Sequence, residues 1–158
     1  MRFLEGKERN EAMKFILEAA EEAKKSTCKK SQRGVVIVKD GKIIGRGRND
    51  TTIEKYCNPC IRQNIDNKVN VELCAAYHAE QDAIIDALEK GRDLSGSRMY
   101  HIKVKDGEIK TSGKPSCTVC SRLVVRSNIG EFVIMHDEGL ALYNSREFNE
   151  KSFEYFFK

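Results

Sequence analysis

The sequence predicts a layered α/β domain. Amphipathic helical patterns alternate with short apolar strand patterns, and an Asp40-Gly41 pair indicates a tight hairpin between two of the strands. The chain has 158 residues, 40% of them hydrophobic, and shows no internal repeat, linker or low-complexity segment. This length suffices to bury one core, so we expect a single domain over residues 1–158.

The first elements are a helix and a hairpin. Residues 7–25 carry apolar side chains three and four positions apart, which predicts an amphipathic helix. Residues 34–39 form a buried-strand pattern, and residues 43–48 return as the paired strand after the turn. Residues 49–70 have no clear periodicity and are predicted to form a long loop, a kind of loop that is usually functional or held by a metal.

The second half continues the alternation of helices and strands. Residues 72–90 form a second helix pattern, which Gly91 ends as a C-terminal cap. Residues 98–104 are predicted to form a strand followed by a turn at Asp106-Gly107. The patterns of the remaining chain predict a helix over 117–127, a short strand over 132–135 and a terminal helix over 147–157.

Composition and charge exclude several classes of protein. No apolar run approaches the 18 residues of a membrane span, and residues 1–10 are charged, unlike a signal peptide. We therefore expect a cytoplasmic protein without a membrane partner. The net charge of +4 is too small to indicate a dedicated nucleic-acid binder and suits a small anionic substrate as well. Four cations could meet a phosphate, although such charges are usually solvated: Arg33, Arg46, Arg48 and Lys114.

Two short motifs indicate a metal centre. His78 lies in a helix pattern, and the run Pro-Ser-Cys-Thr-Val-Cys places Cys117 and Cys120 at the start of another. Imidazole and thiolate are favoured zinc ligands, and three protein ligands leave the fourth tetrahedral position for water, as in catalytic sites. The positive end of a helix dipole favours thiolate over thiol at the two cysteines. A redox pair is the rival interpretation of Cys117 and Cys120, but it leaves the His-x-Glu motif unexplained.

Glu80 supplies the remaining chemical group. It follows His78 by two residues, so both side chains can approach one ion at a helix start. The carboxylate need not bind the metal. Such a group suits a reaction in which water attacks an amidine-like carbon of a ring and ammonia is lost. The carboxylate can take protons from the water and deliver them to the ring nitrogen and to the leaving amine.

Together the two motifs resemble the cytidine and deoxycytidylate deaminase superfamily of zinc-dependent enzymes, over roughly residues 7–136. The resemblance implies a three-layer α/β/α fold with a five-stranded mixed sheet. It also implies that His78, Cys117 and Cys120 bind a catalytic zinc and that Glu80 is the proton shuttle. The substrate would be a small nucleotide or nucleoside such as dCMP or cytidine. Relatives are usually oligomers, so we expect a homo-oligomer.

The resemblance extends to two substrate contacts and has departures near the expected cavity. The backbone N–H of Ala79 would help to hold the base, and Asn49 stands where relatives place a residue that touches the sugar or base. However, Ser116 separates Pro115 from the first cysteine, whereas relatives commonly place the proline directly before it. Residues 103–113 look like an insertion. These departures leave the identity of the substrate open.

Four further cysteines suggest a second, structural zinc. Cys57 and Cys60 form another C-x-x-C pair in the long loop, Cys74 precedes His78 by four residues, and Cys28 follows the first helix in a context similar to that of deoxycytidylate deaminases. Four thiolates would make a closed site that holds the loop. Alternatively, Cys28 or Cys74 is a buried thiol, or His101 replaces one of them as a ligand.

Three functional interpretations follow from these motifs. The first is a deaminase of a cytosine-type nucleotide or nucleoside. The second is a deaminase of another base, such as guanine or adenosine in tRNA, against which the modest charge argues. The third is a non-catalytic zinc-stabilised domain, which the retention of Glu80 disfavours.

Overall fold

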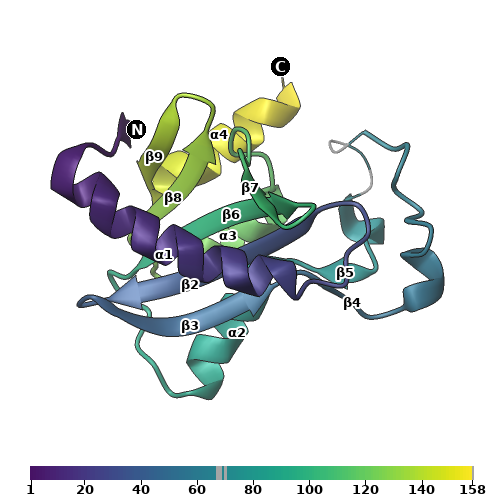
Figure 1. Ribbon diagram of the computed structural model, residues 1–158, viewed down its shortest axis with the longest axis horizontal. Helices are drawn as coiled ribbons and strands as arrows, with labels where there is room; N and C mark the ends of the chain where they lie inside the picture. Colours follow the sequence, from purple (N-terminus) through teal and green to yellow (C-terminus); the bar gives the residue numbers. More distant parts are fainter. Residues whose placement is uncertain (67–68, 70, 158) are drawn as a thin grey trace.

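The protein, described here from a computed structural model over residues 1–66, 69 and 71–157, is built around a mixed β-sheet (Figure 1). The strand order is β1 (Arg2–Phe3), β9 (Gly139–Asn144), β8 (Glu131–His136), β6 (Arg98–Lys105), β2 (Gln32–Lys39) and β3 (Lys42–Arg48), while β7 (Glu108–Lys110) also pairs with β6. The β6–β8 pair is parallel and the other pairs are antiparallel. Five longer strands therefore form the predicted mixed sheet, extended by two short ones.

Helices cover both faces of the sheet. Helix α1 (Gly6–Lys24) lies across one face, and α2 (Ala79–Glu89) and α3 (Thr118–Arg126) lie behind the other (Figure 1). Helix α4 (Ser145–Phe157) packs beside α3, and its Phe148 stacks on Phe132 of β8 with ring centroids 3.7 Å apart. The three-layer α/β/α prediction is confirmed.

The period-two alternation of β2 separates the two cores. Val36 and Val38 belong to the cluster that contains the buried face of α1, whereas Val35 and Ile37 belong to the cluster beneath α2 and α3. Successive strand residues point to opposite faces, so one continuous apolar run serves both helical layers.

The second helix begins later than predicted. The sequence pattern predicts a helix over residues 72–90, but α2 starts at Ala79 because the preceding chain is extended. Strand β5 (Ala76–Tyr77) pairs with β4 (Asp50–Thr51), and residues Val71–Leu73 form a 3-10 turn. The pairing with β4 outweighs the local helical pattern. Gly91 follows the helix with a φ of +67°, as expected of a C-terminal cap.

Five of the described strands are absent from the sequence prediction: the two-residue strands β1, β4 and β5, and the longer strands β7 and β9. Strand β9 returns antiparallel to β8, and β7 folds the predicted insertion back along β6 after the Asp106-Gly107 turn. Each is held in place by its pairing with a neighbouring strand, a contact that local sequence patterns do not report. The terminal helix also begins two residues earlier than predicted, at Ser145.

The predicted loop over 49–70 is largely confirmed. It contains β4 and a 3-10 turn at Glu54–Tyr56, and it extends to one side of the sheet (Figure 1). Residues 67, 68 and 70 lie outside the described part. None of the described helices combines the length and the apolarity that crossing a membrane requires.

Candidate active site

Three donor atoms from two helix starts converge in the structure. His78 Nδ1 lies 3.0 Å from Cys120 Sγ and 3.4 Å from Cys117 Sγ, and the two sulfur atoms are 3.0 Å apart. Zinc–sulfur and zinc–nitrogen bonds of about 2.3 and 2.0 Å in a tetrahedron place donor atoms roughly 3.5 Å apart. A small outward movement of the side chains would therefore admit the ion, and the group fits one zinc.

Local backbone structure explains this convergence. His78 is the N-cap of α2, with extended backbone angles, and its N–H donates to the Gln81 side chain over 2.9 Å. Cys117 is the N-cap of α3, where its sulfur accepts a hydrogen bond from the Cys120 N–H over 3.3 Å. Each motif thus opens a helix, and the two helix starts face each other.

Protons and a metal ion compete for these donor groups. The hydrogen bond between the two sulfur atoms lowers the pKa of Cys117 to about 5, while the same bond and burial raise the pKa of Cys120. Burial acts to lower the pKa of His78, but hydrogen bonds with Cys117 and Cys74 outweigh it and raise that pKa to about 10. In the metal-free protein, the donor atoms are joined by shared protons. A divalent ion that binds there would replace these protons.

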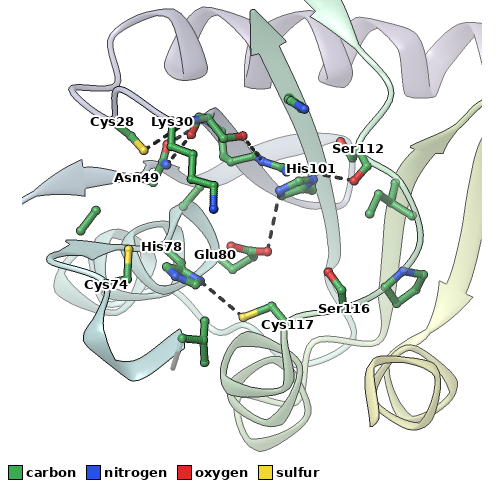
Figure 2. A pocket seen from close by; sticks show the side chains of 18 of the residues that line it. Cys28, Lys30, Asn49, Cys74, His78, Glu80, His101, Ser112, Ser116 and Cys117 are labelled. Atoms are coloured by element: carbon green, nitrogen blue, oxygen red, sulfur yellow. Dashed lines mark hydrogen bonds and ion pairs between the residues drawn. The ribbon is translucent and has the colours of Figure 1, made fainter. Parts of the chain in front are cut away.

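Glu80 lies beside this group and faces the same cavity (Figure 2). Its exposed fraction is 7%. Burial acts to raise the pKa of the carboxyl, but the nearby His101 and His78 rings and the Arg33 guanidinium outweigh it, so the pKa is lowered. The carboxylate form is therefore favoured, and a buried carboxylate beside a metal site can accept a proton.

The cavity has a volume of about 290 Å³, at the lower end of the range for small-molecule sites. The aromatic rings of Phe132 and Phe148 and the side chain of Ile134 form part of its wall. Among the described residues, its lining includes one carboxylate, Glu80, and five cationic side chains: Lys30, Arg33, Arg62, Lys103 and Lys114. The cavity therefore suits a ligand that combines an apolar ring with negative charge.

Strand register places some of the polar wall. His101 pairs with Val35, and Lys103 pairs with Arg33, across the β2–β6 ladder. Because alternate residues share a face, Arg33, His101 and Lys103 continue the face whose deeper part is the apolar core under α2 and α3. The sheet face thus changes from apolar to polar where the cavity begins.

Of the four cations considered from the sequence, two line the cavity and two do not. Arg33 and Lys114 are in its wall. Arg46 pairs with Glu18, and Arg48 pairs with Asp50, each over 2.9 Å. The sequence interpretation missed Lys103 as a residue of the cavity and considered His101 only as an alternative ligand of the second zinc. The available signal was the alternation along the predicted strand, in which His101 and Lys103 share one face and Ile102 lies on the other.

The two predicted substrate contacts also border the cavity. Ala79 is the first residue of α2, where backbone N–H groups have no partner within the helix. The Asn49 side chain holds neighbouring segments together, because its Oδ1 accepts hydrogen bonds from Ser26 and from the Arg33 N–H while its Nδ2 donates to the Ser31 carbonyl. Contact of either residue with a substrate stays a prediction.

The four cysteines of the predicted second zinc site do not form a second group of three or more close donors within the described residues. Cys28, Cys60 and Cys74 border the cavity, and Cys74 hydrogen-bonds to the His78 ring. Cys57 is buried, and its sulfur accepts a hydrogen bond from the Thr51 hydroxyl over 2.9 Å. Nor is His101 part of such a group. The second zinc remains a prediction.

Comparison with known proteins identifies relatives of this arrangement. A family model described as the cytidine and deoxycytidylate deaminase zinc-binding region matches residues 7–136. Deoxycytidylate deaminase of Saccharomyces cerevisiae is 30% identical over 122 residues, which cover 75% of this chain and 35% of the yeast protein. Deoxycytidylate deaminase of Mycobacterium phage D29 is 28% identical over 127 residues, covering 75% of this chain and 89% of the phage protein.

A solved structure shares the fold. The dCMP deaminase of cyanophage S-TIM5, solved in complex with dCMP and dUMP, superposes with a TM-score of 0.54 at 18% identity and covers 82% of each chain. The present chain thus corresponds to most of two phage proteins but to about a third of the yeast protein's length.

Proposed function

Because this chain belongs to the cytidine and deoxycytidylate deaminases, a family of zinc-dependent enzymes, we propose that it hydrolyses the exocyclic amine of a cytosine-type nucleotide. The observation that most directly supports this proposal is the position of the buried Glu80 carboxylate. It shares one cavity with the group of donor side chains formed by His78, Cys117 and Cys120. The reaction consumes one water and converts the cytosine to uracil with release of ammonia.

His78, Cys117 and Cys120 would hold the catalytic zinc. When bound, zinc supplies Lewis-acid chemistry that produces a strong nucleophile from water near neutral pH. Three ligands from two helix starts form an open site, and the cavity gives the substrate access to it.

Glu80 would move the protons of the reaction. Its carboxylate accepts one proton from the attacking water and transfers it to the ring nitrogen as the water oxygen adds to C4. It then takes the second proton from the new C4 hydroxyl and delivers it to the amine, which leaves as ammonia while C4 becomes a carbonyl. Its place beside the donor group and inside the cavity wall supports this role. Burial excludes bulk water that would compete for these protons.

The charge of the cavity favours a nucleotide over a nucleoside. Five cationic side chains and one carboxylate line it, and a 5′-phosphate would balance this excess. Lys103 and Arg33 lie opposite each other on neighbouring strands and both line the cavity, so the two would bind such a group together. We therefore propose dCMP as the first substrate to examine.

The proposal is tested by measuring ammonia release from zinc-loaded protein with dCMP, CMP, deoxycytidine, cytidine, cytosine, guanine and adenosine. We expect activity on a cytosine nucleotide and weaker activity on the matching nucleoside. Preference for a nucleoside would overturn the assignment of a nucleotide substrate. Activity confined to guanine or adenosine would overturn the assignment of cytosine as the base. Inactivity toward the whole panel, with zinc bound, would contradict the proposed function.

Three broader expectations remain part of this proposal: a cytoplasmic location, assembly into a homo-oligomer, and a second zinc at Cys28, Cys57, Cys60 and Cys74. The location rests on the composition of the chain, the assembly on the resemblance to this family, and the second zinc on the cysteine pattern together with that resemblance. Sedimentation of the purified protein measures its assembly, and metal analysis measures its zinc content.

A further inference from the structure

Three buried side-chain atoms lack a hydrogen-bonding partner in the described part of the protein: Arg62 Nε, His101 Nδ1 and Ser112 Oγ. All three residues line the same cavity. Buried polar atoms are nearly always hydrogen-bonded, so these three atoms call for polar partners, which a ligand in the cavity can supply. By contrast, both polar atoms of the Asn49 amide are engaged by the protein's own backbone and side chains.

Two of these residues lie at the two ends of one stretch of chain, and Ser112 belongs to the insertion that distinguishes this chain. His101 is on β6, and Ser112 follows β7 at the end of the insertion over residues 103–113. The Ser112 backbone is anchored, because its N–H donates to the Met135 carbonyl over 2.8 Å and its carbonyl accepts from Arg33 over 3.5 Å. The insertion thus ends with a serine held at the cavity wall.

Hydrogen-bonding chemistry indicates what this pair can recognise. His101 Nε2 lies 3.8 Å from Glu80 Oε1 (Figure 2). A carboxylate only accepts hydrogen bonds, so it favours the neutral tautomer that carries its proton on Nε2. Nδ1 is then an acceptor that needs a donor, while the Ser112 hydroxyl can donate. A ligand hydroxyl both donates and accepts, which neither a carbonyl nor a fully ionised phosphate does.

Position supports a hydroxyl of the sugar. Along one face of β6, His101 stands beside Glu80, and Lys103 follows two residues later with Arg33 opposite it. A nucleotide with its base at Glu80 and its phosphate at Lys103 would carry its sugar past His101. We propose that His101 and Ser112 are specificity-determining residues that hydrogen-bond to a sugar hydroxyl of the nucleotide substrate. This inference rests on the proposed function.

The experiment combines removal of a sugar hydroxyl from the substrate with removal of the Ser112 hydroxyl from the protein. Values of kcat/KM are measured for CMP, 2′-deoxy-CMP and 2′,3′-dideoxy-CMP with the zinc-loaded wild type and Ser112→Ala. In the wild type, deleting the recognised hydroxyl should lower kcat/KM about tenfold. In Ser112→Ala the same deletion should cost much less, because the interaction is already absent. Thr111→Ala is the matched control, since Thr111 is exposed and outside the cavity wall.

Substitutions of His101 provide a second, independent test. An asparagine can place its amide oxygen near the position of Nδ1, so His101→Asn should retain preference for the hydroxyl, while His101→Leu should lose it. Zinc content and thermal unfolding show whether each variant is folded and loaded.

Two results would overturn the inference. If the effects of hydroxyl removal and of Ser112→Ala on kcat/KM multiply independently, the serine does not bind the sugar. If neither hydroxyl affects the wild type, no sugar hydroxyl is recognised. Both results require that the wild type deaminates at least one of the three nucleotides. If it deaminates none of them, the proposed function is overturned, and this inference with it.

Discussion

Gly47 on β3 packs directly against Ala79, the first residue of the helix that follows His78. A Cβ atom built at Gly47 would lie 2.4 Å from the Ala79 carbonyl oxygen and 2.3 Å from the Ala83 nitrogen. Both are backbone atoms that cannot turn aside. The absence of a side chain at Gly47 therefore lets the start of α2 approach the sheet, and that approach places His78 and Glu80 at the cavity.

The first prediction is that Gly47→Ala moves this helix start. Overpacking of this kind costs about 1–3 kcal/mol of unfolding free energy, and zinc affinity should fall with it. Urea unfolding and metal analysis measure the two effects. Gly130→Ala is the matched control, because the nearest atom to its Cβ is 3.4 Å away. Equal stability of the two variants would contradict the packing argument.

The second prediction separates proton transfer from metal binding. Glu80→Gln keeps the shape of the side chain but removes the base, so kcat should fall by at least about two orders of magnitude while zinc is retained. The assay is steady-state ammonia release, with zinc content measured on the same sample. A fully active variant would assign the proton to another residue.

The third prediction concerns the ligands. Cys117→Ser should lose the catalytic zinc, because one of the three protein donors is replaced by a weaker one. Cys57→Ser should keep it, since Cys57 is outside the cavity wall. Metal analysis also tests the second site: two zinc ions per chain in the wild type, with loss of one in each variant, would support it. Full occupancy in Cys117→Ser would refute the ligand assignment.

The fourth prediction examines the proposed phosphate contact. Lys103→Met should raise the KM for dCMP about tenfold or more, because a charge-assisted hydrogen bond is lost. The KM for deoxycytidine should hardly change. Lys105→Met is the control on the same strand, with an exposed side chain outside the cavity. A similar change for both substrates would mean that Lys103 does not bind the phosphate.

The fifth prediction uses the buried His101 imidazole. Burial lowers its pKa from 6.5 to about 4. As the pH falls below about 6.5, the imidazole of His101 becomes protonated in the unfolded chain but stays neutral in the folded protein. The free energy of unfolding therefore declines until the pH reaches the pKa of the folded state. This contribution amounts to about 3 kcal/mol and should be absent in His101→Asn. Urea unfolding between pH 4 and 7 compares the two proteins; parallel curves would show that His101 does not titrate in this way.

The sequence was sufficient to predict that these donor groups gather in one place, because each motif is local. His78 and Glu80 are two residues apart, and Cys117 and Cys120 are three apart, so a helix start brings each pair to one place whatever surrounds it. The layered fold was predictable for a similar reason, since alternating apolar patterns report which faces must be buried.

Tertiary structure decided the start of α2 and the composition of the cavity wall. The pairing of β5 with β4 delays the helix to Ala79 despite the helical pattern that precedes it. His101 and Lys103 become neighbours of Glu80 and Arg33 only through the register of β6 against β2 and the packing of α2 on that sheet. Contacts between residues so far apart in the chain depend on pairing and packing, so the sequence determined the reactive groups and the folded structure determined what surrounds them.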